Sequence, residues 1–160
     1  MVNNKSKEKL VSILLVPILI ILVVLLSPII VVWYLRYLAK GLILKHSFRK
    51  KLKKENKNIL FAYSDSHHWQ QYIEENILPV IESSAIVINR SRDSEWKNNN
   101  PIEYQVIDRW GGGKEYNPIA IIFPQKGKIK NIRFYQAFKD LKHGNSAPLK
   151  EKENELFDYL

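Results

Sequence analysis

The chain has 160 residues, a net charge of +9 from 25 Lys and Arg against 16 Asp and Glu, and no cysteine. This length holds one modest domain with an appendage and excludes a large multidomain enzyme. The absence of cysteine excludes disulfides, thiolate metal sites, iron–sulfur clusters and cysteine nucleophiles.

The basic excess is confined to the first third of the chain. Residues 1–56 hold 11 basic and two acidic side chains, which leaves 14 of each in residues 57–160. A nucleic-acid-binding domain carries its basic residues on the folded domain itself. Cations that flank an apolar run are instead typical of a membrane protein. The charge distribution therefore predicts a lipid partner and no nucleic acid.

Residues 1–9 form a short N-terminal tail before an uncharged run, residues 10–35. A bilayer core of about 30 Å needs about 20 helical residues, so this run predicts a single transmembrane helix. A signal peptide has a shorter apolar region of about 7–15 residues and ends in small residues. This run ends at Trp33 and Tyr34, an aromatic belt followed by cations. A buried core helix is seldom so long or so evenly apolar.

Two prolines interrupt the apolar run. Pro17 and Pro28 each remove one backbone hydrogen bond, which a helix in lipid must compensate locally. A re-entrant hairpin bent at a proline is the alternative to a single span.

A basic juxtamembrane segment, residues 36–56, follows the span. Lys and Arg are enriched on the cytoplasmic side of a membrane span. Three lysines precede this span, whereas eight Lys and Arg residues follow it. We therefore predict a cytoplasmic C-terminal domain. Each of these cations would contribute about 1 kcal/mol on a leaflet with anionic headgroups. The predicted membrane-surface residues are Arg36, Lys40, Lys45, Arg49, Lys50, Lys51, Lys53 and Lys54.

Apolar residues alternate with these cations, at Leu38, Leu42, Ile43, Phe48 and Leu52. This pattern favours an amphipathic helix that lies in the headgroup plane. The alternative is a charged stalk that continues the transmembrane helix.

Residues 57–160 are predicted to form a soluble α/β (α+β) domain that folds without residues 1–56. Short apolar runs predict strands at 59–63, 85–89, 119–123 and 129–135. Apolar spacings of three and four predict a helix over 69–81, which Pro79 should bend or end. Asn100, Pro101 and Glu103 are a helix start, and Gly111–Gly113 ends that helix. Further helices are expected near 138–143 and after Ser146.

The element order β-α-β-α-β-β-α over residues 58–144 resembles a thioredoxin-like domain. A short loop from Ser64 to Trp69 follows the first strand and opens a helix, and Pro118 precedes the third strand, where that fold carries a cis proline. Another small α/β sandwich is the alternative. The family's two cysteines, two residues apart, are missing here, so thiol–disulfide exchange is excluded.

The candidate catalytic residues are Asp65, Ser66, His67 and His68. Neutral imidazoles ligate zinc or act as general bases. Adjacent residues on a helix point about 100° apart, so the pair does not converge on one metal without a loop geometry, and no metal site or cofactor is predicted. Ser-His-Asp triads usually gather from distant segments, and these Ser and Asp side chains also suit helix capping.

The candidate binding residues are Asn117, Pro118 and the loop residue Trp96. If the third strand is antiparallel to the first, Asn117 and Pro118 lie beside the loop 65–68. The N–H groups of a helix that starts there favour an anionic ligand group.

These features together predict a membrane-anchored, non-catalytic binding or scaffolding module with a protein partner, for example a small subunit of a membrane complex. The alternative is an enzyme with an acid/base site at the loop 65–68.

Overall fold

The structure, a computed structural model, describes residues 4–91, 98–99, 101–112 and 117–160, with side chains from Leu15 onward. Helix α1 runs without interruption from Asn4 to Lys54. The chain divides into two compact units, Met1–Leu42 and Ile43–Leu160, so α1 belongs to the first unit over most of its length and to the second in its last turns.

The first unit is helical and apolar. From Leu15, α1 is long and apolar enough to cross a membrane, with a mean hydropathy of 3.2 in its most apolar window. The large apolar side chains between Leu15 and Leu35 are 43–67% exposed. The alternative of a re-entrant hairpin, with two short arms bent at a proline, does not agree with this one continuous helix.

The helix compensates locally for Pro28. A proline has no N–H, so the carbonyl of Val24, four residues earlier, loses its usual donor. The Ser27 hydroxyl donates to that carbonyl at 2.9 Å. At the end of the apolar run, the rings of Trp33 and Tyr37 stack with centroids 6.1 Å apart.

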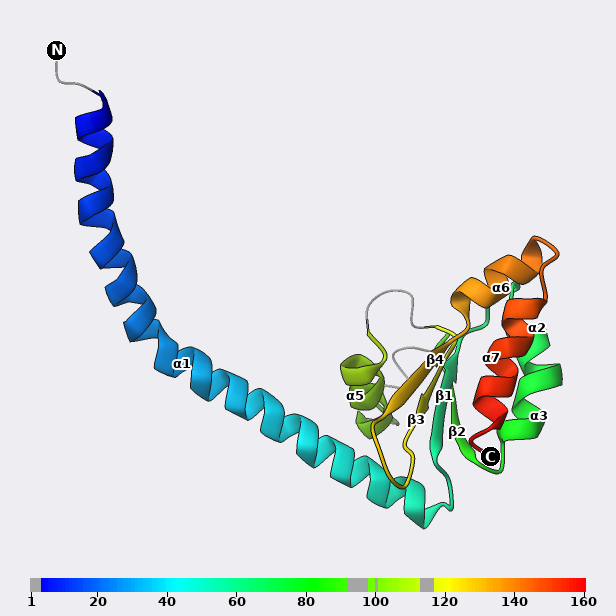
Figure 1. The fold of residues 1–160 in the computed structure, drawn as a ribbon. Helices are drawn as coiled ribbons and strands as arrows, with labels where there is room; N and C mark the ends of the chain where they lie inside the picture. Colours follow the sequence, from blue (N-terminus) through cyan, green and yellow to red (C-terminus); the bar gives the residue numbers. More distant parts are fainter. Residues whose placement is uncertain (1–3, 92–97, 100, 113–116) are drawn as a thin grey trace. The chain divides into compact units, whose positions relative to one another are not determined.

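The second unit is built on a four-stranded sheet with the order β2-β1-β3-β4 (Figure 1). The strands are β1 (Ile59–Tyr63), β2 (Ala85–Asn89), β3 (Ile119–Ile122) and β4 (Lys130–Arg133). β1 is parallel to β2 and antiparallel to β3, and β4 is antiparallel to β3. The two central strands, β1 and β3, are buried at every position, as expected when both faces of a sheet are covered.

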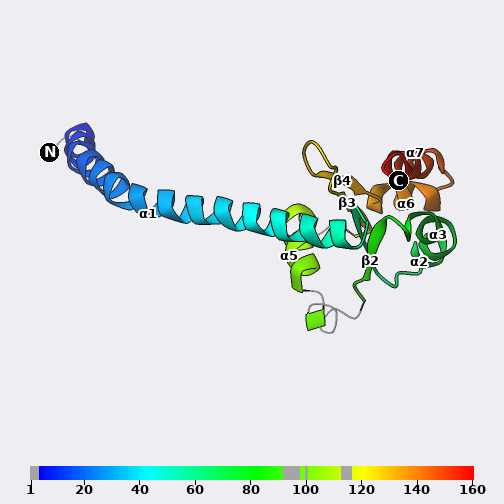
Figure 2. The ribbon, with the colours of Figure 1, turned by 90° about the horizontal axis from the view of Figure 1, so that it is seen from below.

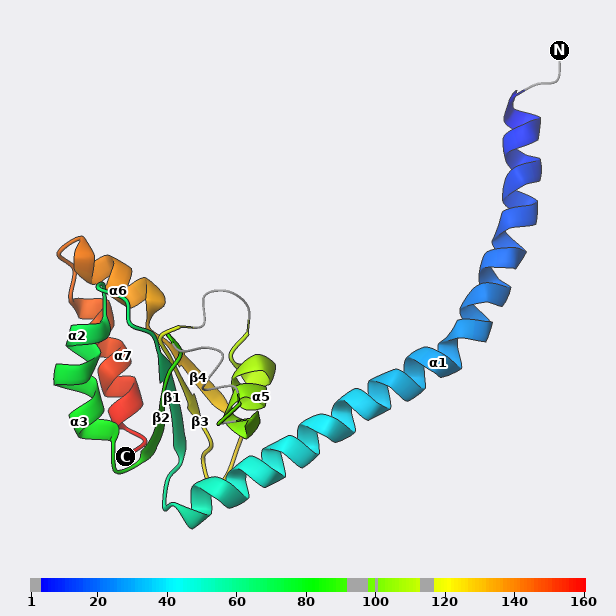
Figure 3. The ribbon, with the colours of Figure 1, turned by 180° about the vertical axis from the view of Figure 1, so that it is seen from behind.

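Helices cover both faces of the sheet, as Figures 1, 2 and 3 show. One face packs against α2 (Gln70–Tyr72), a π-helical turn (Ile73–Ile77), α3 (Leu78–Ile81), α6 (Tyr135–Lys142) and α7 (Ala147–Phe157). The other packs against α5 (Pro101–Trp110) and the end of α1. Because successive strand residues point to opposite faces, Phe61 joins the first core and Leu60 the second.

The helix predicted over 69–81 is segmented. It begins at Gln70 and passes through the π-helical turn before α3, where Pro79 occupies the first turn. Pro79 has no N–H to donate, so the regular hydrogen-bond pattern cannot continue through it. The fourth strand is also shorter than predicted, because α6 already begins at Tyr135.

The last turns of α1 belong to the core of the second unit. Phe48 is fully buried and Leu52 is 2% exposed. The Phe48 ring meets Phe123 edge to face at a centroid distance of 5.0 Å. The prediction that Phe48 and Leu52 face the headgroup plane is therefore wrong, because the domain itself covers them. The compact unit begins at Ile43 and not at residue 57.

Candidate functional sites

Three chain segments meet at one edge of the sheet. β1 ends at Tyr63 beside the end of β2 at Asn89, and Ala62 pairs with Ile119 at the start of β3. The loop after β1, the segment after β2 and the Asn117-Pro118 pair before β3 therefore lie at the same edge of the sheet. The candidate catalytic residues 65–68 and the candidate binding residues Asn117 and Pro118 lie at this edge.

Asp65 is held by the end of β2. Its carboxylate accepts a hydrogen bond from the Asn89 side chain, and its backbone N–H donates to the Ser91 hydroxyl. The Ser91 N–H in turn donates to the Asn89 side-chain oxygen at 3.0 Å. In the part of the chain that the structure describes, no hydrogen bond or ion pair joins the Asp65 carboxylate to an imidazole. Asp65 thus fixes the loop and is not coupled to a histidine.

Ser66 organises the turn that precedes α2. Its carbonyl accepts the N–H groups of Trp69 at 3.0 Å and Gln70 at 2.8 Å, and its hydroxyl accepts the His68 N–H at 3.4 Å. The Ser64 carbonyl accepts the indole N–H of Trp69 at 3.1 Å. α2 begins at Gln70 and has no side-chain cap, so the predicted capping of its first turn is replaced by this turn.

The two histidines lie closer together than helical spacing predicts. Because His67 and His68 occupy a turn and not a helix, their ring centroids are 3.7 Å apart. Desolvation, then the neighbouring His67 and Lys142, lower the pKa of His68 below its ordinary 6.5. Among the described residues, no three His, Asp or Glu side chains group in a way that could hold a metal ion.

The candidate binding residues are placed in part. The peptide bond between Asn117 and Pro118 is cis, and Pro118 is buried. The Pro118 carbonyl accepts the N–H of Phe134 at 3.0 Å, which ties the start of β3 to the chain after β4. Trp96 lies outside the described residues.

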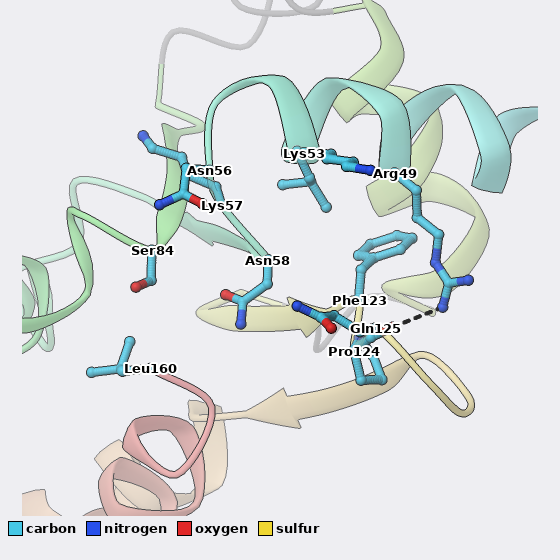
Figure 4. A pocket seen from close by; sticks show the side chains of 11 residues that line it. Arg49, Lys53, Asn56, Lys57, Asn58, Ser84, Phe123, Pro124, Gln125 and Leu160 are labelled. Carbon is cyan, nitrogen blue, oxygen red and sulfur yellow. Dashed lines mark hydrogen bonds between the residues drawn. The ribbon is translucent and has the colours of Figure 1, made fainter.

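A pocket of about 630 Å³ opens at the opposite edge of the sheet (Figure 4). Arg49, Leu52 and Lys53 of α1 form one wall, with Lys57 in the turn that follows. The other walls come from chain segments distant in sequence: Asn58 and Ser84 before β1 and β2, Phe123, Pro124 and Gln125 after β3, and Leu160. The pocket lies entirely within the second unit.

The pocket wall is basic and polar. Its lining residues, all in the described part of the chain, include three cations and no Asp or Glu. The Arg49 Nη2 donates to the Pro124 carbonyl at 2.9 Å, and the Asn58 amide donates to the Tyr159 carbonyl at 2.7 Å. Within the described chain, Arg49 Nε and Asn58 Oδ1 are buried without a hydrogen-bond partner.

Two of the predicted membrane-surface cations make contacts inside the domain. Arg49 bonds to Pro124, as above, and the Lys51 ammonium forms an ion pair at 2.5 Å with Glu103, a carboxylate only 1% exposed. Lys50, Lys53 and Lys54 are exposed. Cations of the basic segment therefore stabilise the fold of the domain, in addition to any role at a membrane surface.

The comparisons with known proteins add no relative. No family model matches the chain, and no curated protein or solved structure matches it.

Proposed function

We propose that this protein is a single-pass, membrane-anchored binding module without catalytic activity. Its small domain would lie on the cytoplasmic side, held at anionic lipid, and would engage a protein partner. The observation that carries the proposal is the apolar part of α1, whose large side chains from Leu15 to Leu35 are 43–67% exposed.

These exposed apolar side chains need an apolar environment. Monomeric soluble proteins rarely expose contiguous apolar patches larger than a few hundred Å². A helix satisfies its backbone hydrogen bonds internally and can therefore enter lipid. The Ser27 hydroxyl on the Val24 carbonyl meets the same requirement beside Pro28. Eight cations after the apolar run against three before it favour a cytoplasmic domain.

Binding is favoured over catalysis by the use that the loop 65–68 makes of its polar groups. Asp65 is bonded to Asn89 and Ser91, and Ser66 accepts the backbone N–H of His68. A nucleophile needs a base within hydrogen-bond reach, and the base needs a third group that orients it. Within the described residues, this loop has no such chain of hydrogen bonds.

A thioredoxin-like assignment of the domain is part of the proposal. It is supported by the β-α-β-α-β-β-α order and by the antiparallel pairing of β1 with β3. Without cysteines, such a domain would present its sheet edge and loops as a binding surface.

Membrane insertion and orientation can be tested on the full chain. Because there is no native cysteine, Ser6→Cys and Lys126→Cys each introduce a unique thiol on opposite sides of the apolar run. The protein should stay in the membrane pellet after alkaline carbonate. In intact cells, a membrane-impermeant maleimide should label the Ser6→Cys variant and spare the Lys126→Cys variant. Release by carbonate contradicts the anchor, and the reverse labelling contradicts the orientation.

The enzyme alternative is separated by a second experiment. Partners that co-purify with the full chain in mild detergent should be identified by mass spectrometry, for wild type and for the His67→Ala and His68→Ala variants. A binding module keeps its partners and its cellular function in both variants. Loss of function with unchanged partners and folding would favour the acid/base site.

A further inference from the structure

We propose that the pocket between the end of α1 and the starts of β1 and β2 binds a phosphate ester that carries a free hydroxyl group. The phosphate would lie at Arg49 and Lys53, and the rest of the ligand would extend toward Asn58, with its hydroxyl there (Figure 4). This assignment goes beyond the binding module proposed above, since it names a site and a ligand class.

The charge pattern of the pocket favours the binding of an anion. Arg49 and Lys53 are one helical turn apart on α1, and Lys57 follows in the next turn of the chain. Arg49 and Lys53, both within the helix, therefore repel each other and weaken it. In the described part of the chain none of the three forms an ion pair, and no carboxylate side chain lines the pocket. A bound anion would relieve that repulsion.

The geometry of Arg49 favours phosphate over a simple halide. The bond from Nη2 to the Pro124 carbonyl holds the guanidinium at the pocket wall (Figure 4). A fixed guanidinium presents its remaining N–H groups as a fork that matches phosphate oxygens. Lys53 adds an ammonium group, which attracts the charge of a phosphate monoester or diester alike.

Two buried atoms, one on each of two walls of the pocket, indicate the rest of the ligand (Figure 4). Arg49 Nε is a donor and Asn58 Oδ1 an acceptor, and within the described chain neither has a partner. Buried polar atoms are nearly always hydrogen-bonded in native proteins, so each calls for an explanation. The phosphate would accept from Arg49, and a ligand hydroxyl would donate to Asn58. A volume of about 630 Å³ leaves room for a polyol carrying one phosphate.

Two sources share this chemistry, a free sugar or glycerol phosphate and the headgroup of an anionic lipid. The test uses the full chain in a neutral detergent. Glycerol 3-phosphate binding is measured by calorimetry, and short-chain phosphatidylglycerol is compared with short-chain phosphatidylcholine by native mass spectrometry. A response to glycerol 3-phosphate identifies a free ester, and a response to phosphatidylglycerol alone identifies a lipid headgroup.

Matched variants decide whether the pocket is responsible. The Arg49→Gln/Lys53→Gln variant should weaken binding by about tenfold or more. The control Lys50→Gln/Lys54→Gln removes the same charge from exposed positions of the same helix that do not line the pocket, and should change binding by about twofold or less. Equal losses in both variants, or no binding to either probe, overturn the proposal.

A further variant guards against a simple folding defect. Arg49 bonds to Pro124, so its loss also affects the fold, whereas Lys53 has no described hydrogen bond or ion pair. Lys53→Glu should therefore leave the melting temperature unchanged and abolish binding. Unchanged binding with this charge reversal contradicts the site. Binding of glycerol 3-phosphate in detergent does not require a bilayer, so this test and the membrane test fail independently.

Discussion

Helix α1 has two apolar regions that differ in what covers them. Between Leu15 and Leu35 every large apolar side chain is exposed, whereas Phe48 and Leu52, a few turns later, are buried in the core of the second unit. Large apolar side chains occur in both regions, although only the second also holds cations, so the hydrophobicity of a single side chain does not show what covers it. The difference lies in whether other parts of the same chain cover them.

The largest effect is expected when the covered region is removed. A fragment of residues 57–160 lacks Phe48 and Leu52, which uncovers Val106, Ile107 and Phe123. The two losses are worth about 3–5 and 2–5 kcal/mol, against a typical total of about 5–15 kcal/mol. In urea denaturation followed by tryptophan fluorescence, we expect no cooperative transition for this fragment. A fragment of residues 43–160 should retain one, and equal midpoints for the two fragments would refute this account of the core.

A single substitution sharpens the same comparison in the full chain. Phe48→Ala deletes a fully buried ring that contacts Phe123 and should cost about 3–5 kcal/mol of unfolding free energy. Ile43→Ala, on the same helix and 66% exposed, should cost under about 0.5 kcal/mol. Chemical denaturation in detergent measures both. The comparison fails if the two variants are equally stable.

The ion pair that joins α1 to α5 should have an intermediate effect. Lys51→Met leaves the Glu103 carboxylate, 1% exposed, without its partner, and a broken buried pair costs about 3–5 kcal/mol. Because the Lys51 side chain is 36% exposed, solvent reduces this, and we expect about 2 kcal/mol. Lys50→Met is the exposed control. Lys51→Met/Glu103→Leu should recover most of the loss, and a double variant no better than Lys51→Met would argue against charge burial as the cause.

The smallest effect is a pH dependence at the loop 65–68. The folded protein lowers the pKa of His68 below 6.5, so the unfolded chain binds this proton more tightly. The stability linked to His68 is therefore complete above about pH 6.5 and is lost as the pH falls below that value. His68→Gln should flatten this part of the melting-temperature profile between about pH 7 and 5. If the melting temperature of the variant depends on pH as steeply as that of the wild type, another group causes the effect.

Much of the fold is predictable from the sequence because its signals are local. The runs at 59–63 and 85–89 became β1 and β2, and Pro101 with Glu103 marked the start of α5. Pro79 predicted that the helix over 69–81 would bend or end, but it did not predict the π-helical turn that precedes it. A single missing N–H indicates where a helix changes and not how it adjusts.

The role of the basic segment could not be predicted in the same way. Phe48 and Leu52, spaced between cations, suit a headgroup-facing helix as well as a core helix. Which of the two forms depends on Phe123 and Ile107, which lie far along the chain. The pocket was missed for the same reason. Arg49 and Lys53 are one helical turn apart, but Asn58, Ser84 and Gln125 join them only through the sheet.

The central claim is that lipid covers one apolar region of α1 and that the domain covers the other. Its most direct test is the accessibility of positions along the helix in a bilayer. Nitroxide labels at Leu22→Cys and Lys50→Cys, each a unique thiol in this cysteine-free chain, are compared for collisions with oxygen and with a water-soluble nickel chelate. We expect oxygen to dominate at Leu22 and the chelate to dominate at Lys50, because oxygen concentrates in lipid and the chelate stays in water. Equal access of the chelate to both positions would show that the apolar region lies in water, and would contradict the account.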